Sequence, residues 1–227
     1  MKILVLTGAG ISAESGLPTF RDSGGLWHGH RPEDLATPEA FARNPALVLD
    51  FYNARRQAVQ AAEPNAAHVA LARLQASERH KVIIVTQNVD DLHERAGARR
   101  VVHMHGSILR ACCTACGAAW AASYAMDAED PCPDCGEPAV RPDVVWFGES
   151  PRDLNLIHKA IEKADLFVSI GTSGSVYPAA GFAARASCRG VRTIEINKAL
   201  SLNSSEFQER REGNATDLVP AWVDELR

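Results

Sequence analysis

Short apolar segments alternate along this chain with longer segments of helical periodicity, and this alternation restricts the possible folds more than any other feature. The runs at residues 3–6 and 82–85 are too short for helices and are rich in the branched residues of buried strands. Strands separated by helices usually form a parallel sheet with helices packed against its faces. The sequence therefore predicts an α/β fold with a mostly parallel, buried sheet.

Four of the predicted strands end in polar or glycine-rich loops, at residues 8–10, 87–90, 171–173 and 197. In sheets of this kind, ligands bind beyond the carboxyl ends of the strands, where such loops meet. The repeated pattern predicts a nucleotide-binding crevice along that edge of the sheet.

The first of these loops, "TGAGISAESG", is similar to a dinucleotide phosphate loop. Small residues let the backbone approach a pyrophosphate, and amides at a helix start suit an anion. The pattern is incomplete, because Ala13 stands in place of its last glycine and no acidic residue closes the next strand. A simple tight turn is the alternative, and a hydride-transferring dehydrogenase is disfavoured.

Cysteines supply the second specific pattern. Four of the six form two Cys-x2-Cys pairs: Cys113 with Cys116, and Cys132 with Cys135. This spacing is typical of a zinc ribbon, in which four thiolates close a tetrahedral shell and leave no position open for water. The predicted zinc ion is therefore structural. Cys112 is a competing ligand with a different spacing, and Cys188 is expected to be a small core residue.

Charge and the N-terminal sequence restrict the partners and the compartment. The formal net charge is −4 and the chain has no basic run, which argues against nucleic acid and anionic membranes as primary partners. The apolar run at residues 3–6 is too short for a signal peptide or a membrane span. We therefore expect a cytoplasmic protein without a membrane partner.

The segment "LVLDFYNARRQAV" predicts an amphipathic helix in which two adjacent arginines have different environments. At about 100° per residue, Arg55 lies within the arc of apolar side chains, whereas Arg56 falls on the polar side. We expect Arg56 to be solvated. A buried arginine needs a partner, so Arg55 is expected to face an anion.

Two histidines stand at the end of the strand predicted in "RVVHMHGS", where a base would face the crevice. His105 is the better candidate, but His103, two positions back, points the same way in an extended strand. The geometry of the sequence leaves both open.

Several longer motifs together resemble those of the sirtuins, a family of NAD-dependent protein-lysine deacylases. In the family's order they are "GAGISAESGLPTFR", "TQNVDDLHERAG", "HMHGS", the paired Cys-x2-Cys motifs, "VVWFGE", "GTSGSVYPAA" and "IEIN". The resemblance implies one catalytic domain in which NAD lies between a Rossmann-like lobe, with helices on both faces of its sheet, and a small lobe. We expect the Rossmann-like lobe at about residues 1–27, 66–107 and 144–227, and the small lobe at about 28–65 (helical) and 108–143 (zinc module).

The same resemblance assigns the NAD site. The implied cofactor-binding residues are Gly8, Ala9, Gly10, Glu14, Thr19, Phe20, Arg21, Gln87, Asn88, Val89, Asp90, Gly171, Thr172, Ser173, Asn197 and Ala215. His105, the histidine directly before a glycine, matches the catalytic base of the family, and Asn88 belongs to the same catalytic centre. The family transfers the acyl group of the lysine to NAD and yields nicotinamide and O-acyl-ADP-ribose.

The resemblance also implies how the substrate binds. An acyl-lysine peptide would add a strand between the lobes. The implied contacts are Val145, Phe147, Gly148, Glu149, Val176 and Tyr177. We expect the enzyme to act on protein substrates as a monomer.

The acyl group would occupy a channel beside the helix that carries Tyr52 and Arg55. These residues are three apart and share a face, so a guanidinium and a hydroxyl could hold one carboxylate together. The pair matches the sirtuin branch that removes succinyl and malonyl groups, and we expect weaker deacetylation. The alternatives are a general deacetylase, with Arg55 in a salt bridge to an acid such as Glu33, Asp34 or Glu39, and a non-catalytic zinc-ribbon module that senses NAD.

Overall fold

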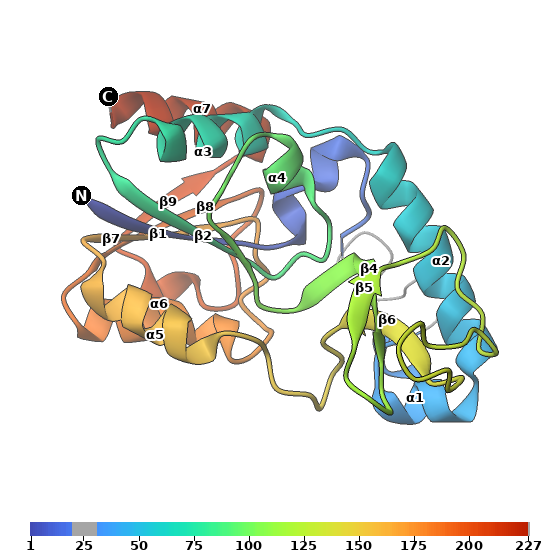
Figure 1. Ribbon diagram of the computed structural model, residues 1–227. Helices are drawn as coiled ribbons and strands as arrows, with labels where there is room; N and C mark the ends of the chain where they lie inside the picture. Colours follow the sequence, from blue (N-terminus) through green and yellow to red (C-terminus); the bar gives the residue numbers. More distant parts are fainter. Residues whose placement is uncertain (20–30, 227) are drawn as a thin grey trace.

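The larger of two sheets forms the centre of the fold. The structure, a computed structural model, describes residues 1–19 and 31–226 (Figure 1). Six parallel strands form this sheet in the order β3-β2-β1-β7-β8-β9. They are β1 (Lys2–Thr7), β2 (Lys81–Thr86), β3 (Val101–His103), β7 (Leu166–Ile170), β8 (Arg192–Asn197) and β9 (Glu209–Glu212).

Helices cover both faces of this sheet. On one face lie α3 (Ala66–Ala76), the short α4 (Leu92–Arg95) and α7 (Ala215–Glu225), and on the other α5 (Leu154–Lys163) and α6 (Phe182–Cys188) (Figure 1). Residues of β1 alternate between the two cores, because successive side chains of a strand point to opposite faces. Ile3 packs with α3 and α7, whereas Leu4 packs with α5 and α6. The predicted Rossmann-like α/β fold is confirmed.

The second lobe combines two helices with a small antiparallel sheet of order β5-β4-β6 (Figure 1). Its elements are α1 (Pro38–Arg43), α2 (Pro45–Ala61), β4 (Gly106–Cys113), β5 (Ala119–Ala121) and β6 (Val140–Val144). The Asn44 side chain accepts a hydrogen bond from Leu47 N, and this cap starts α2 directly after α1. Among the described residues, no helix is both long and apolar enough to cross a membrane.

Short 3-10 turns make up the remaining regular structure, at Ala9–Ile11, Ala13–Ser15, Pro32–Asp34, Ala179–Gly181 and Ser204–Glu206. The first two follow β1, in the place where a dinucleotide-binding fold usually begins a long helix. The phosphate-loop motif therefore folds into two tight turns.

The strand order reverses between β1 and β7, and the loops after these two strands touch. A Cβ atom on Gly10 would lie 2.7 Å from Gly171 Cα, and one on Gly171 would lie 2.5 Å from Ile11 N. Gly171 also has a φ of +63°, which favours glycine. Glycine is therefore required where the two loops meet, at the point where α/β sheets bind their ligands.

Candidate active site

A cleft of about 750 Å³ opens at the carboxyl edge of the larger sheet. All four predicted strand-end loops contribute to its wall: Gly8, Ala9, Gly10, Gln87, Asn88, Val89, Asp90, Gly171, Thr172, Ser173 and Asn197. At its floor, the Asn197 side-chain amide donates to Thr172 O over 2.7 Å and links the ends of β8 and β7. The volume is typical of a site for a small molecule or cofactor.

Glu14 joins the first loop to the start of α7. Its carboxylate accepts hydrogen bonds from the Thr216 backbone N–H at 3.1 Å and the Thr216 hydroxyl at 2.8 Å. This contact places Ala215 beside the loop, and Glu14, Thr19 and Ala215 all line the cleft. Phe20 and Arg21 lie outside the described residues.

Three buried, hydrogen-bonded polar side chains connect the first loop with the loop after β2. The Ser12 hydroxyl donates to Asp90 Oδ2 over 3.1 Å and accepts from the Asn88 side-chain amide, also over 3.1 Å. Burial raises the pKa of Asp90. Sequence reasoning missed Ser12, although it stands within the quoted phosphate-loop motif.

His105 lies between β3 and β4 and faces the cleft. Its Nδ1 atom is 3.0 Å from the carbonyl oxygen of Gln87. A carbonyl only accepts hydrogen bonds, so Nδ1 carries the proton and Nε2 of the neutral ring is left as an acceptor. Burial lowers the pKa of His105, and the hydrogen bond to Gln87 opposes this effect.

His103 has a different environment, which distinguishes the two candidates. Its Nε2 atom lies 2.7 Å from Glu94 Oε1, and the residue is not among those that line the cleft. Burial alone would lower the pKa of His103, but the hydrogen bond and charge of Glu94 raise it. His103 is therefore paired with a carboxylate outside the cleft, whereas His105 faces into it.

Helix α2 forms the opposite wall with one face. The lining residues of α2 are Tyr52, Ala54, Arg55, Ala58 and Val59. Burial raises the pKa of Tyr52 to about 12, so the hydroxyl stays protonated. Burial lowers the pKa of Arg55, while Tyr52 and Asp90 act in the opposite direction.

The prediction that Arg56 is solvated is wrong, because its side chain is 0% exposed. It donates to the carbonyl of Ile108 at 2.8 Å, to Asn53 Oδ1 at 2.7 Å and to the sulfur of Met126 at 3.1 Å. On this face α2 is covered by β4 and by the segment around Met126, which offer a backbone carbonyl and a sulfur atom to Arg56. Helical periodicity detects only faces covered by apolar neighbours, and it therefore missed this contact.

The segment after β6 forms the rim of the cleft. Val145 N–H donates to His105 O at 2.8 Å, and Phe147 N–H donates to Ala36 O at 2.9 Å. Gly148 and Glu149 of the same segment also line the cleft, as do Val176 and Tyr177 of the segment after β7, and Tyr177 is 78% exposed. All six residues that the resemblance implies in peptide binding therefore line the cleft.

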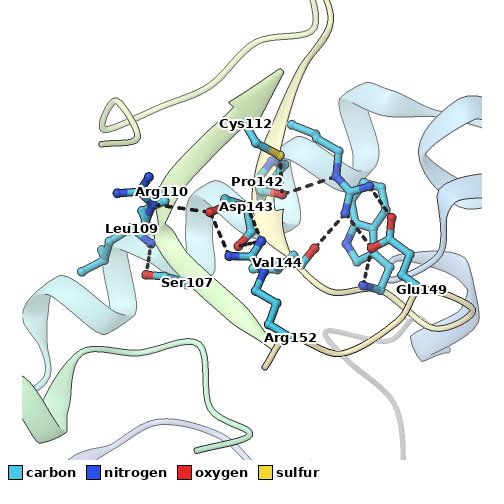
Figure 2. A network of polar contacts seen from close by, with 11 residues as sticks. Ser107, Leu109, Arg110, Cys112, Pro142, Asp143, Val144, Glu149 and Arg152 are labelled. Carbon is cyan, nitrogen blue, oxygen red and sulfur yellow. Dashed lines mark hydrogen bonds and ion pairs between the residues drawn. The ribbon is translucent and has the colours of Figure 1, made fainter. Parts of the chain in front are cut away.

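Asp143 anchors this rim segment. It accepts hydrogen bonds from Arg110 of β4 at 3.4 Å and from Arg152, which precedes α5, at 3.1 Å (Figure 2). Burial opposes ionisation, but the hydrogen bond and charge of Arg152 hold the pKa of Asp143 below its usual range. This network ties the small sheet to the chain that returns to the larger lobe.

The four predicted zinc ligands converge. Their sulfur atoms all lie within 4.8 Å of one another, and the pairs Cys113–Cys135 and Cys116–Cys132 are each separated by 3.7 Å. Four ligands about 2.3 Å from a tetrahedral zinc ion stand roughly 3.8 Å apart, so the cluster fits this metal. The predicted four-cysteine site is confirmed.

The other two cysteines lie elsewhere. Cys112 is directed toward Pro142 O, 4.0 Å away, and is not part of the metal-binding group. Cys188 is exposed at the end of α6, so the prediction of a small core residue is wrong. The helix ends there, and its last residues no longer face the sheet.

We compared the sequence and the structure with those of known proteins, and the matches are to one family. The sequence pattern of the Sir2 family matches residues 8–178. This chain belongs to the Sir2 family.

Its relatives are similar over nearly their whole length. An NAD-dependent protein deacylase of Caulobacter vibrioides is 54% identical over 100% of this chain and 97% of its own. A crystal structure of a Sir2 homologue with NAD has a TM-score of 0.92 at 41% identity, covering 100% of this chain and 89% of the other. A Sir2 mutant with a bound peptide and NAD has a TM-score of 0.84 at 26% identity, covering 98% and 92%.

Proposed function

We propose that this chain, an NAD-dependent protein deacylase of the Sir2 family, removes succinyl and malonyl groups from protein lysines more efficiently than acetyl groups. The observation that carries the proposal is that Tyr52 and Arg55 line the same cleft as His105. A planar guanidinium can hold a carboxylate with two parallel hydrogen bonds, and a protonated phenol can add a third. We also propose a cytoplasmic location, as expected from the sequence.

The loops at the carboxyl edge of the sheet are the proposed NAD site. The loops Gly8–Gly10 and Gly171–Ser173 would lie against the phosphates, with Asn197 and Ala215 near the adenosine. Residues 87–90 would hold the nicotinamide ribose and carboxamide. NAD supplies the acceptor for the acyl group and releases nicotinamide.

His105 is the proposed base. Because Gln87 O holds the proton on Nδ1, Nε2 is available to take a proton from a hydroxyl group in the cleft. The buried group of Ser12, Asn88 and Asp90 would keep the adjoining loop in place. The chemistry needs a site from which bulk water is excluded, and the second lobe provides the cover.

The acyl-lysine peptide would enter along the rim segments and pair with them as an added strand. Exposed aromatic side chains at the cleft support this placement, because Phe147 is 43% and Tyr177 is 78% exposed and both line the cleft. The lysine side chain would then point between the lobes, toward His105 and α2.

The expected preference follows from a charge pair that only an acidic acyl group could form with Arg55. Losing one partner of a buried, hydrogen-bonded charge pair costs about 2–5 kcal/mol, or roughly 30- to several-thousand-fold. An acetyl group has no carboxylate with which to form this pair, but water that enters the space of the missing carboxylate would reduce the difference. Deacetylation is therefore expected to be weaker and still measurable.

The test compares kcat/KM on matched acetyl-, malonyl- and succinyl-lysine peptides for the natural protein and for Arg55→Met. We expect desuccinylation to fall by about 30-fold or more, and deacetylation to change by less than about threefold. Gln57→Met, on the exposed side of α2, is the matched control and should change neither activity. Equal losses on all three peptides would instead indicate a general deacetylase in which Arg55 has a structural role.

A further inference from the structure

We propose that Trp146 is a positioning residue for acyl specificity, because its indole N–H holds the Tyr52 hydroxyl as a hydrogen-bond donor toward the acyl channel. This inference rests on the proposed preference for acidic acyl groups and goes one step further, to what orients the residue that would recognise them.

The contact between the two rings is short and buried. Trp146 Nε1 lies 2.9 Å from the Tyr52 hydroxyl oxygen, and the residues are 2% and 5% exposed. An indole N–H can only donate, so the hydroxyl oxygen accepts and its own hydrogen must point away from the indole. Both residues line the cleft, and we infer that this hydrogen points into it.

Arg141, which is itself paired with Glu149, packs against the face of the Trp146 indole and holds it in place. The guanidinium carbon of Arg141 lies 3.5 Å from the centroid of the Trp146 ring, a cation–π distance. The guanidinium is itself fixed by two hydrogen bonds to Glu149, at 2.6 and 2.9 Å, and by one to Val144 O at 2.7 Å (Figure 2). The indole therefore has little freedom to rotate.

Glu149 binds both the Arg141 guanidinium and the backbone of Trp146. Its Oε2 atom also accepts a hydrogen bond from the Trp146 backbone N–H over 2.8 Å. The carboxylate, although its residue lines the cleft, is thus directed at Arg141 and Trp146. In this arrangement Glu149 shapes the rim, and its contribution to substrate binding acts through Trp146.

The orientation has a consequence for specificity. A hydroxyl that has already been turned toward the channel can donate to a carboxylate without first being ordered, which reduces the cost of binding. An acetyl group carries no acceptor at that distance, so its turnover does not depend on the orientation. Removing the indole N–H should therefore weaken desuccinylation and leave deacetylation nearly unchanged.

The experiment is a double-mutant cycle of Trp146→Phe and Tyr52→Phe, measured with succinyl- and acetyl-lysine peptides. Phenylalanine at 146 keeps an aromatic ring beneath Arg141 but removes the donor. We expect each single variant to lower kcat/KM for desuccinylation by about three- to tenfold, mainly through KM. The double variant should be no worse than Tyr52→Phe alone, and deacetylation should change by less than about twofold.

Additive losses in the cycle would overturn the inference, as would equal losses on both peptides, which would show that Trp146 only packs. If the natural protein shows no preference for succinyl peptides over acetyl peptides, the proposed function fails, and the inference fails with it. Thermal unfolding of each variant establishes that it is folded.

A second measurement tests the hydrogen bond without any substrate. In a protein labelled with 15N at tryptophan, the indole N–H resonance of Trp146 should move upfield when Tyr52→Phe removes the acceptor. Trp222, buried in α7 against the larger sheet, should keep its resonance and serves as the internal control. An unchanged Trp146 resonance would overturn the inference.

Discussion

The Nδ1 atom of His105 is held 3.0 Å from the carbonyl oxygen of Gln87. This contact selects the tautomer whose free nitrogen, Nε2, is the one not engaged by the protein backbone. The carbonyl belongs to the loop after β2, and the histidine follows β3. Two neighbouring strands of the parallel sheet therefore determine together where the free nitrogen lies, and the proposed base depends on their register.

The first prediction concerns pH. Burial lowers the pKa of His105 below the ordinary value of about 6.5, and only the neutral ring can accept a proton at Nε2. Activity should therefore be on a plateau near pH 7 and fall as the pH drops through the lowered pKa. A pH profile of kcat/KM with succinyl peptide should show its acidic midpoint below about 6.5. A midpoint above this value would contradict the assignment.

The second prediction separates the two histidines. We expect His105→Ala to reduce deacylation of every acyl peptide by at least about 100-fold, because a general base contributes this much, while NAD still binds. His103→Gln should retain most of the activity, since His103 pairs with Glu94 outside the cleft. Nicotinamide release in the presence of acyl peptide measures turnover, and calorimetric titration measures binding. Normal release by His105→Ala would show that another group is the base.

The third prediction compares two adjacent arginines. We expect Arg56→Met to lower the free energy of unfolding by about 2–3 kcal/mol, because it removes the donors to Ile108 O and Asn53 from a buried site. Arg55→Met should affect unfolding less and substrate preference more. Urea denaturation of both variants tests this difference. An Arg56→Met midpoint equal to that of the natural protein would mean that the buried contacts of Arg56 contribute nothing to stability.

The fourth prediction concerns the contact between the loops after β1 and β7. In Gly10→Ala the new methyl group would come within 2.7 Å of Gly171 Cα, so one loop must move. We expect affinity for NAD to fall by about tenfold or more. Gly181→Ala is the control, because its methyl group would meet only Tyr177 Cε1 at an ordinary 3.7 Å. Isothermal titration with NAD measures both, and equal affinities would show that the loops can separate freely.

The fifth prediction concerns zinc. Cys132→Ser should lose the bound metal, roughly one ion per chain, and lower the unfolding temperature by about 5 °C or more. The loss should reach α2, because the backbone of Met126 in the zinc module exchanges hydrogen bonds with the Asn53 side chain at 2.9 and 3.0 Å. Hydrogen exchange should therefore increase in α2 as well as in the module.

Cys188→Ser is the matched control for zinc, since this thiol is exposed and lies outside the metal-binding group. Metal content by atomic spectroscopy and the unfolding temperature should both stay unchanged in this variant. Unchanged exchange in α2 of Cys132→Ser would show that the zinc module does not support the wall of the cleft.

Local patterns in the sequence predicted the buried strands that lead to the cleft, the helix that carries Tyr52 and Arg55, and the identity of the metal site. Buried strands need continuous apolar runs, and two Cys-x2-Cys pairs suffice to predict four thiolates around zinc, because both properties depend on residues close together in the chain. The glycine-rich loop after β1 was recognisable for the same reason. Its folding into two 3-10 turns was not, because the approach of Gly171 from a distant loop imposes that shape.

Only the tertiary structure decided which of two equivalent residues has which environment. In an extended strand His103 and His105 would point the same way, but β3 ends at His103, and Glu94 and Gln87, from other segments, distinguish the two histidines. Arg56 was misjudged because its partners come from β4 and from the zinc module, about which the periodicity of α2 carries no information. A sequence pattern indicates which apolar surface a segment must bury. The polar groups that contact the segment come from residues distant in the sequence, so only the tertiary structure shows them.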